Sequence, residues 1–183
     1  NFPSPEARGV KKGQDPKGNP VECPPDANAP FSGQIFKTVA DQFAGKISVF
    51  RVWSGTLKAD SGFMNVSSET HERFGQILVM NGKTATPVTE AGPGDIVAVA
   101  KLKNTATGDS IADDKHAVKF EPLPQVQPVI SFAIRPKDKG AEDKLANALP
   151  RIIEEDPTIH ISRDVDGKEV LISGMGQLHV EIT

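Results

Sequence analysis

The chain is poor in cysteine, tryptophan and tyrosine. It contains a single cysteine, Cys23, a single tryptophan and no tyrosine in 183 residues. One thiol cannot form an intrachain disulfide, and with no second cysteine it does not define a zinc site. The four histidines are scattered, with no pair at metal-ligand spacing, so we expect no metal in this chain. The lack of tyrosine also argues against a tyrosine-rich platform for stacking single-stranded bases.

Long apolar runs are also missing. No stretch approaches the ~18 apolar residues that a membrane helix needs, and residues 1–10 lack the apolar centre of a signal peptide. We therefore expect a cytoplasmic protein with no membrane partner. The formal net charge is −3, so the chain as a whole is not a polycation, and any contact with RNA must be local.

The sequence contains no recognisable catalytic centre. The stretch NGKT at residues 81–84 matches the end of a phosphate-binding loop, but the first glycine of that motif would fall at Ile77. We therefore expect a hairpin turn there. Serine, histidine and aspartate show no readable nucleophile arrangement either. We expect this chain to be no enzyme by itself and to hold no cofactor.

The chain divides into three segments by composition. Prolines are concentrated in residues 1–30, where their fixed φ predicts an extended leader. Residues 31–123 contain short β-type runs between turn residues, which predict a six-stranded β-barrel because closure removes exposed sheet edges. The expected strands are 33–40, 46–53, 62–66, 73–80, 95–102 and 116–120.

Residues 124–183 show a different periodicity. We expect a strand at 129–134, a helix at 140–156 interrupted at Pro150, two strands at 158–163 and 168–173, and a second helix from residue 174. Asp166 and Gly167 suit the tight turn between those two strands. The order β-α-β-β-α is one strand short of a ferredoxin-like α+β unit, so we expect this domain to be incomplete at its C-terminus.

Several longer stretches resemble one family. Two stretches look like the second-domain barrel of translational GTPases, namely GKISVFRVWSGTLKADSGFMNV and AGPGDIVAVAKLKNTATGDSIAD. Two later stretches resemble the third domain of bacterial elongation factor G, namely EEDPTIHISRD and VLISGMGQLHVEI. Order and spacing match as well, and the opening NFPSP resembles the end of that family's GTPase domain. The chain is thus similar to a middle segment of elongation factor G, with Gln177 and Val180 where the family usually has Glu and Leu.

The resemblance implies a function and its partners. The family's translocase uses GTP and Mg²⁺ in a GTPase domain whose P-loop and guanine motif are absent from this sequence, so only the full-length parent is expected to be a GTPase. The barrel is expected to dock on the GTPase domain and on small-subunit ribosomal RNA and proteins. The third domain is expected to couple the state of the GTPase to the ribosome, alongside later domains of the same protein.

Matching positions imply two sets of site residues. The candidates for contact with ribosomal RNA are Arg51, Ser54, Lys58, Lys101 and Lys103. Those facing the GTPase switch and the fusidic acid pocket are Gly174, Gly176, Leu178 and His179. For the glycines, a tight strand-to-helix turn is the simpler interpretation, and we expect both the turn and the switch-facing role to hold.

Two other hypotheses remain open at this point. One is a freestanding β-barrel binding module joined to a ferredoxin-like ligand domain, which the missing strand disfavours because it leaves a bare sheet edge. The other is a small metabolic enzyme whose glycine turns bind phosphate, which the mismatched phosphate loop disfavours.

Overall fold

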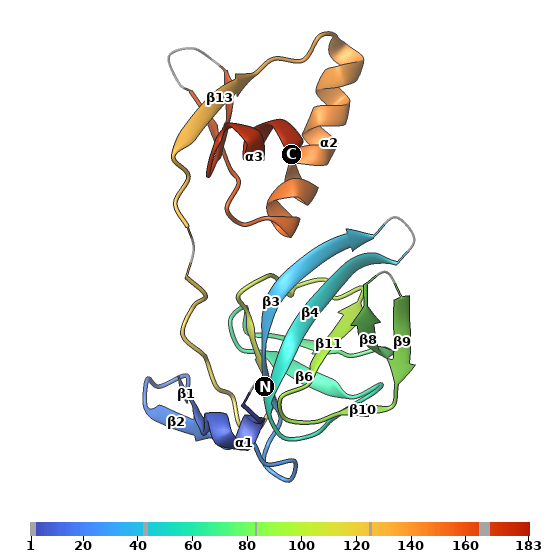
Figure 1. Cartoon of the computed structure of the whole chain (residues 1–183), viewed down its shortest axis with the longest axis vertical. Coiled ribbons are helices and arrows are strands. Elements are labelled where there is room, and N and C mark those ends of the chain that lie inside the picture. The colour runs from blue at the N-terminus through green and yellow to red at the C-terminus, as the bar shows by residue number, and fades with distance from the viewer. Residues whose placement is uncertain (1–2, 42–43, 83, 125, 165–168) are drawn as a thin grey trace. The chain divides into compact units, whose positions relative to one another are not determined.

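The structure, a computed structural model of the chain, describes residues 3–41, 44–82, 84–124, 126–164 and 169–183. The chain forms two compact units, Asn1–Leu123 and Pro124–Thr183, and each is described by itself (Figure 1). None of the helices in the described ranges is long and apolar enough to cross a membrane.

The proline-rich leader has local structure of its own. A one-turn helix, α1 (Pro5–Arg8), starts at Ser4, whose hydroxyl accepts a hydrogen bond from the Ala7 N–H at 3.1 Å. A hairpin follows, formed by β1 (Lys11–Gln14) and β2 (Pro20–Cys23). The prediction of a wholly extended leader is therefore corrected. Turn residues rather than apolar periodicity form the hairpin, since the Asp15 carboxylate accepts from the N–H groups of Lys17 and Asn19.

The first unit is built on an antiparallel sheet of eight strands in the order β7-β6-β12-β3-β4-β11-β8-β9. A short pair, β5 (Leu57–Lys58) with β10 (Glu90–Ala91), completes the wall. The strands of the main sheet are β3 (Ser32–Asp41), β4 (Gly45–Ser54), β6 (Gly62–Asn65), β7 (Thr70–Arg73), β8 (Ile77–Asn81), β9 (Thr84–Val88), β11 (Ile96–Ala100) and β12 (Ser110–Ala112).

The prediction of a barrel-type fold is confirmed, but the expected strand count is corrected. The sheet has eight strands rather than six, because the short segments β7, β9 and β12 pair as strands despite weak apolar alternation. The expected strand 116–120 makes only an isolated bridge between Gln14 and Lys119. Backbone hydrogen bonding decides both the strand count and the absence of a strand at 116–120, and the alternation of apolar residues indicates such bonding only indirectly.

Alternation along the strands fills the interior with apolar side chains. In β4, Phe50 and Val52 are fully buried, while the alternate residues Val49, Arg51 and Trp53 are only partly buried. Phe74 lies at the centre, with its ring centroid 4.0 Å from that of Phe63 and 5.7 Å from those of Phe31 and Phe50. One continuous core thus includes residues from nearly all strands of the wall.

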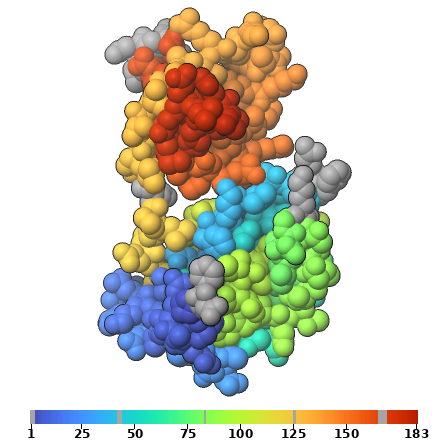
Figure 2. Space-filling model, viewed as in Figure 1, coloured from blue at the N-terminus to red at the C-terminus, as the bar shows by residue number. Residues whose placement is uncertain are grey.

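A second, smaller core attaches the leader to the barrel. Cys23 of β2 is buried together with Val66, Ala112, Val118 and Phe120, which agrees with an inert thiol. In the space-filling view the leader packs directly against the barrel (Figure 2). Gly13 leaves no room between the two, because an added Cβ would lie 2.5 Å from Val118 Cγ2 and 2.9 Å from the Lys119 carbonyl oxygen.

The second unit has the order β13 (Ile130–Ile134), α2 (Lys139–Glu155), β14 (His160–Arg163), β15 (Val170–Gly174) and α3 (Gln177–Ile182). Its three strands form an antiparallel sheet in the order β13-β15-β14, and Figure 1 shows both helices on the same side of it. This confirms the predicted β-α-β-β-α arrangement. The predicted turn at Asp166 and Gly167 lies outside the described residues.

Helix α2 continues through Pro150, which corrects the predicted interruption. Proline removes one helical hydrogen bond and typically costs ~3 kcal/mol in a helix interior. The partly buried residues Leu145, Leu149 and Ile152 lie on both sides of this point at helical spacing, so packing stabilises both halves. Asp138 begins the helix by accepting a hydrogen bond from the Ala141 N–H at 2.8 Å.

Candidate functional site

Strand β4 places Arg51 and Trp53 on the outer surface of the barrel. They are two residues apart, and the fully buried Val52 lies between them. The Arg51 guanidinium carbon is 5.1 Å from the centre of the Trp53 ring, and Lys11 Nζ of the leader is 4.8 Å from the same ring. Both distances fit cation–π contacts. Leader and barrel therefore share one aromatic–cation cluster.

Ser54, the last residue of β4, lies in the interior. Its side chain is 2% exposed. Its hydroxyl is 2.6 Å from the Ser32 hydroxyl and donates to the Pro30 carbonyl at 2.8 Å. This corrects the prediction that Ser54 faces RNA, because its hydroxyl is buried and hydrogen-bonded to residues at the point where the leader enters the barrel. Lys58, in β5, is exposed beside Glu90 of β10.

Lys101 and Lys103 begin a loop that polar contacts hold in place. The Glu72 carboxylate accepts hydrogen bonds from the N–H groups of Lys103 and Asn104, at 2.7 and 3.1 Å, and from the Thr105 hydroxyl at 2.6 Å. Lys101 has a φ of 68°, uncommon for a residue with a side chain, and its N–H donates to the Lys46 carbonyl at 2.8 Å. Both lysine side chains are exposed on an ordered backbone.

Asn65 and Asp109 hold the far side of this loop. The Asn65 amide donates to Asp109 Oδ2 at 2.8 Å and to the Asn104 carbonyl at 3.2 Å, while Asp109 Oδ2 also accepts from the Ala106 N–H. Asn65 is fully buried, so these contacts are shielded from water. The loop is therefore fixed from two sides.

The structure separates Arg51 from the predicted pair Lys101 and Lys103. Arg51 pairs with Ile96 at the start of β11, whereas Lys101 directly follows the end of that strand. Five residues of strand place them roughly 15 Å apart. Arg51 thus belongs with Trp53 and Lys11, and Lys101 belongs with Lys103. Contact of either group with RNA stays a prediction.

At the second predicted site, β15 meets α3 through two glycines with different surroundings. Gly174 is buried, and an added Cβ would lie 2.8 Å from Val180 Cγ2 and 3.0 Å from His179 Nδ1. Gly176 would meet nothing within 4 Å, and its φ of 178° is extended backbone that any residue adopts. Close packing of α3 on β15 therefore requires Gly174 but not Gly176.

His179 joins the start of α3 to the end of α2. The backbone N–H of Met175 donates to its Nδ1 at 3.1 Å, and its Nε2 lies 3.0 Å from Asp156 Oδ2. Because Nδ1 accepts, we assign the proton to Nε2, which donates to the carboxylate. The imidazole is thus fixed in orientation at both nitrogens.

Asp156 caps α2 at its C-terminal end and is the acceptor of this contact. Burial raises the pKa of Asp156, but the hydrogen bonds from Thr158 and from His179 outweigh burial and hold the pKa below its ordinary value of 3.8. Its Oδ1 accepts from the N–H and hydroxyl of Thr158, at 2.9 and 2.6 Å. An ionised Asp156 therefore links the end of α2 and the turn before β14 to α3.

The outer side of the junction is apolar. Leu178 and Ile182 are one helical turn apart and are 68% and 77% exposed, and Met175 is 44% exposed. Leu178 therefore contributes no core packing within this unit, in contrast to Gly174 and His179.

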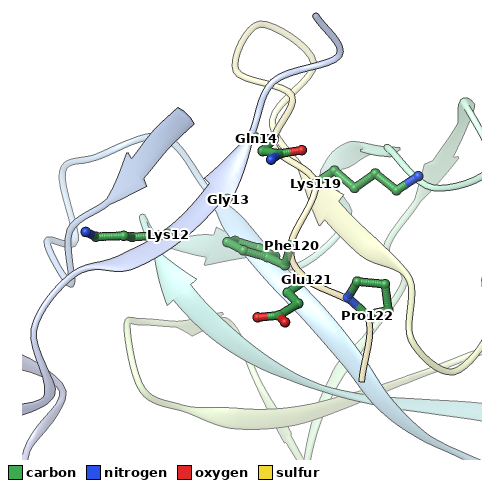
Figure 3. A pocket seen from close by; sticks show the side chains of 7 residues that line it. All are labelled: Lys12, Gly13, Gln14, Lys119, Phe120, Glu121 and Pro122. Atoms are coloured by element: carbon green, nitrogen blue, oxygen red, sulfur yellow. The ribbon is translucent and has the colours of Figure 1, made fainter. Parts of the chain in front are cut away.

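Other predicted and possible sites do not converge on a ligand. The NGKT stretch spans the turn between β8 and β9, where Asn81 pairs with Thr84, and this confirms the hairpin; Lys83 lies outside the described residues. A hollow of about 450 Å³ lies between β1 and residues 119–122, but Lys12 and Lys119 extend away from one another at its rim (Figure 3). Within the described ranges, no group of three His, Cys, Asp or Glu residues could hold a metal ion.

Several residues in these sites were not predicted from the sequence. Trp53 has the period-two relation to Arg51, so β4 alternation could have indicated it. Asp156 precedes Pro157 at the expected end of α2, a position where a cap is common. Glu72 and Lys11 carry no sequence signal, because their partners lie far away along the chain.

Comparisons with known proteins agree with this geometry. The model of elongation factor G domain 2 matches residues 30–114, and that of elongation factor G domain III matches residues 125–183. A crystal structure of a protein from Thermus thermophilus matches with a TM-score of 0.78 and 26% sequence identity, over 99% of this chain and 25% of that one. The chain thus spans a quarter of the length of that protein.

The two matched ranges follow each other in order and together cover well over half of the sequence. They coincide with the barrel and with the β-α-β-β-α unit whose contacts are described above. The resemblance seen in the sequence is therefore confirmed: the chain belongs to the elongation factor G family, of which it carries domain 2 and domain III.

Proposed function

We propose that the chain is part of a ribosomal translocase that uses GTP to drive translation elongation. The observation that carries this proposal is the pair of family matches, domain 2 followed directly by domain III. In this proposal GTP and Mg²⁺ bind a GTPase domain elsewhere in the longer protein. This chain contributes a docking surface and a coupling element, not the catalytic residues.

The barrel provides the docking surface for small-subunit ribosomal RNA. Lys101 and Lys103 extend from a loop whose backbone Glu72 already holds, so little conformational entropy is lost when they meet phosphates. Lysine contacts to phosphate read the position and shape of RNA rather than its sequence. Two exposed lysines on a fixed backbone support this role.

The third domain provides the coupling element, with α3 facing the GTPase switch. The exposed Leu178 and Ile182 offer apolar surface to a neighbouring domain, while His179 ties α3 to α2 through Asp156. A displacement of α3 would therefore be transmitted to α2. Replacing His179 with alanine in the full-length protein is expected to change its sensitivity to fusidic acid, and unchanged sensitivity would remove His179 from the drug pocket.

The proposed function is tested with the full-length protein that contains this chain. We expect ribosomes to stimulate its GTP hydrolysis and the protein to advance messenger RNA by one codon in a toeprinting assay. Hydrolysis that ribosomes do not stimulate would contradict a ribosomal role. Stimulated hydrolysis without movement of the messenger would contradict translocation and favour another ribosomal step.

A further inference from the structure

The aromatic–cation cluster, defined as Arg8, Lys11, Arg51 and Trp53, lies where the leader meets the barrel. Lys11 Nζ lies 4.8 Å from the Trp53 ring centre and 5.8 Å from that of Phe120, and the Arg51 guanidinium carbon lies 5.1 Å from Trp53. Two positive charges therefore share one indole ring. Positive charges gathered around one ring repel one another, and a bound anion would relieve the repulsion.

Two N–H donors in this cluster have no acceptor among the described residues. Arg51 Nε and Trp53 Nε1 are both shielded from solvent, and neither makes a hydrogen bond within the described ranges. Buried donors without partners are rare in folded proteins, because each loses its hydrogen bond to water and gains none in return. Both orphaned donors belong to neighbouring side chains on one face of β4. An oxygen acceptor from outside the chain would satisfy them.

No carboxylate among the described residues forms an ion pair with the cations of the cluster. Of the ion pairs that join described residues, none includes Arg8, Lys11 or Arg51. Asp95 precedes Ile96, the residue that pairs with Arg51, but its carboxylate accepts a hydrogen bond from the Gly92 N–H at 2.8 Å. The cluster is therefore a local excess of positive charge on a chain whose formal net charge is −3.

A small hollow opens between these side chains. Its volume is about 20 Å³, and it is lined by all four residues of the cluster together with Pro5 and Gly94. That volume accommodates one oxygen atom but not a whole phosphate group. The ring of Pro5 closes one side, since an added Cβ on Gly94 would lie 2.2 Å from Pro5 Cγ. A ligand would insert one oxygen here and keep its other atoms at the mouth.

From these observations we propose that the aromatic–cation cluster binds a phosphoryl group, with one phosphate oxygen accepting from Arg51 Nε and Trp53 Nε1. Lys11 and Arg8 then neutralise the remaining phosphate charge. Arginine suits this task because its guanidinium presents several donors in a fixed plane. This site goes beyond the proposed function, because it is defined by the leader as well as by the barrel and requires no ribosome.

The single tryptophan makes the site directly observable. Since the chain contains one tryptophan and no tyrosine, the indole fluorescence comes from Trp53 alone. We would titrate the 183-residue chain with inorganic phosphate, with a short oligouridylate and with polyglutamate, holding ionic strength constant with sodium chloride. We expect a saturable change in Trp53 fluorescence with phosphate, in roughly the millimolar range for a single small anion.

Three variants separate a phosphoryl site from a purely structural cluster. Arg51→Lys keeps the charge but removes Nε–H, and we expect phosphate affinity to fall about tenfold. Lys11→Gln in the leader should weaken phosphate binding without removing either orphaned donor. Lys144→Gln on α2 removes the same charge from an exposed position and should leave the titration unchanged. Far-UV circular dichroism would check that each variant is folded.

Each outcome of the titration decides something. Tighter binding of the oligouridylate than of phosphate would support the site and identify its phosphoryl group as part of an RNA backbone, while equal binding would support a free phosphate ligand. A linear response that matches sodium chloride, or an undiminished response in Arg51→Lys, would overturn the proposal. Polyglutamate binding as tight as oligouridylate would also overturn it, in favour of an acidic protein partner. None of these outcomes bears on ribosome-stimulated GTP hydrolysis, so the proposed function stands or falls separately.

Discussion

Gly174 has no room for a side chain at the point where β15 meets α3. An added Cβ would lie 2.8 Å from Val180 Cγ2 and 3.0 Å from His179 Nδ1, so Gly174→Ala must push α3 away from the sheet. We expect the free energy of unfolding of the second unit to fall by about 1–3 kcal/mol, the usual range for overpacking. Urea unfolding followed by circular dichroism measures the change.

Gly176 provides the matched control for that substitution. Its surroundings are open, its backbone is extended, and it occupies the N-cap position of α3. Gly176→Ser should therefore change stability by less than about 0.5 kcal/mol, because serine is a favourable N-cap residue. Equal destabilisation by both substitutions would contradict the distinct roles assigned to the two glycines.

Asp156 makes the stability of the second unit depend on pH. Against the effect of burial, hydrogen bonds from Thr158 and His179 hold its pKa below the ordinary value of 3.8 in the folded chain. As pH falls below about 3.8, the unfolded chain takes up a proton before the folded chain does, so the stabilisation declines and disappears below the lowered pKa. Urea unfolding of the chain and of Asp156→Asn between about pH 5 and pH 2.5 tests this.

The variant isolates the contribution of Asp156 from those of other carboxyl groups. We expect Asp156→Asn to be less stable than the parent chain at about pH 5 and the two curves to converge towards about pH 2.5. Asp143→Asn removes an exposed carboxylate from the same helix and should run parallel to the parent. A constant gap between the parent and Asp156→Asn at all pH values would show that the contact stabilises by shape alone.

At the scale of elements, the loop between β11 and β12 depends on a carboxylate from β7. Glu72 accepts hydrogen bonds from Lys103, Asn104 and Thr105. Glu72→Gln replaces one acceptor oxygen with an NH₂ group that faces N–H donors. We expect a loss of about 1.5–3 kcal/mol, with faster hydrogen exchange at the amides of Lys103 and Asn104 measured by NMR.

Glu69→Gln is the comparison for that element. Glu69 is exposed in the turn before β7, so its substitution should leave exchange in the loop unchanged. If Glu72→Gln and Glu69→Gln exchanged alike, the Glu72 contacts would not be what orders the loop.

At the scale of the whole molecule, contact with ribosomal RNA would make binding depend on salt. The double substitution Lys101→Glu and Lys103→Glu in the full-length protein should weaken ribosome binding. It should also reduce the slope of log affinity against log salt concentration by roughly 1.5, because binding releases fewer counterions when two phosphate contacts are lost. Affinity measured by filtration at several salt concentrations checks this.

Reversing two other barrel lysines controls for net charge. Lys115 and Lys119 are exposed in the segment that follows β12 and are not among the predicted RNA contacts, so their change to Glu should leave the salt slope nearly intact. If both double variants lowered the slope equally, total charge rather than the Lys101 and Lys103 loop would govern binding.

The sequence by itself determined the broad architecture and the family. Short β-type runs between turn residues predicted a barrel, and helical spacing predicted α2, because these patterns are local and repeat along the chain. The stretches around Arg51 and His179 were specific enough to indicate elongation factor G, as the family matches confirm. Polar strands such as β7 were not predicted, since backbone pairing rather than apolar content holds them in the sheet.

Only the tertiary structure decided which residues meet. It buried Ser54 against Ser32, separated Arg51 from Lys101 along β11, and distinguished Gly174 from Gly176 by the space around each. It also brought Lys11 to Trp53 and Glu72 to Lys103, across 31 residues or more of sequence. Such contacts depend on how distant segments pack, and a local pattern contains no information about a partner that lies far away along the chain.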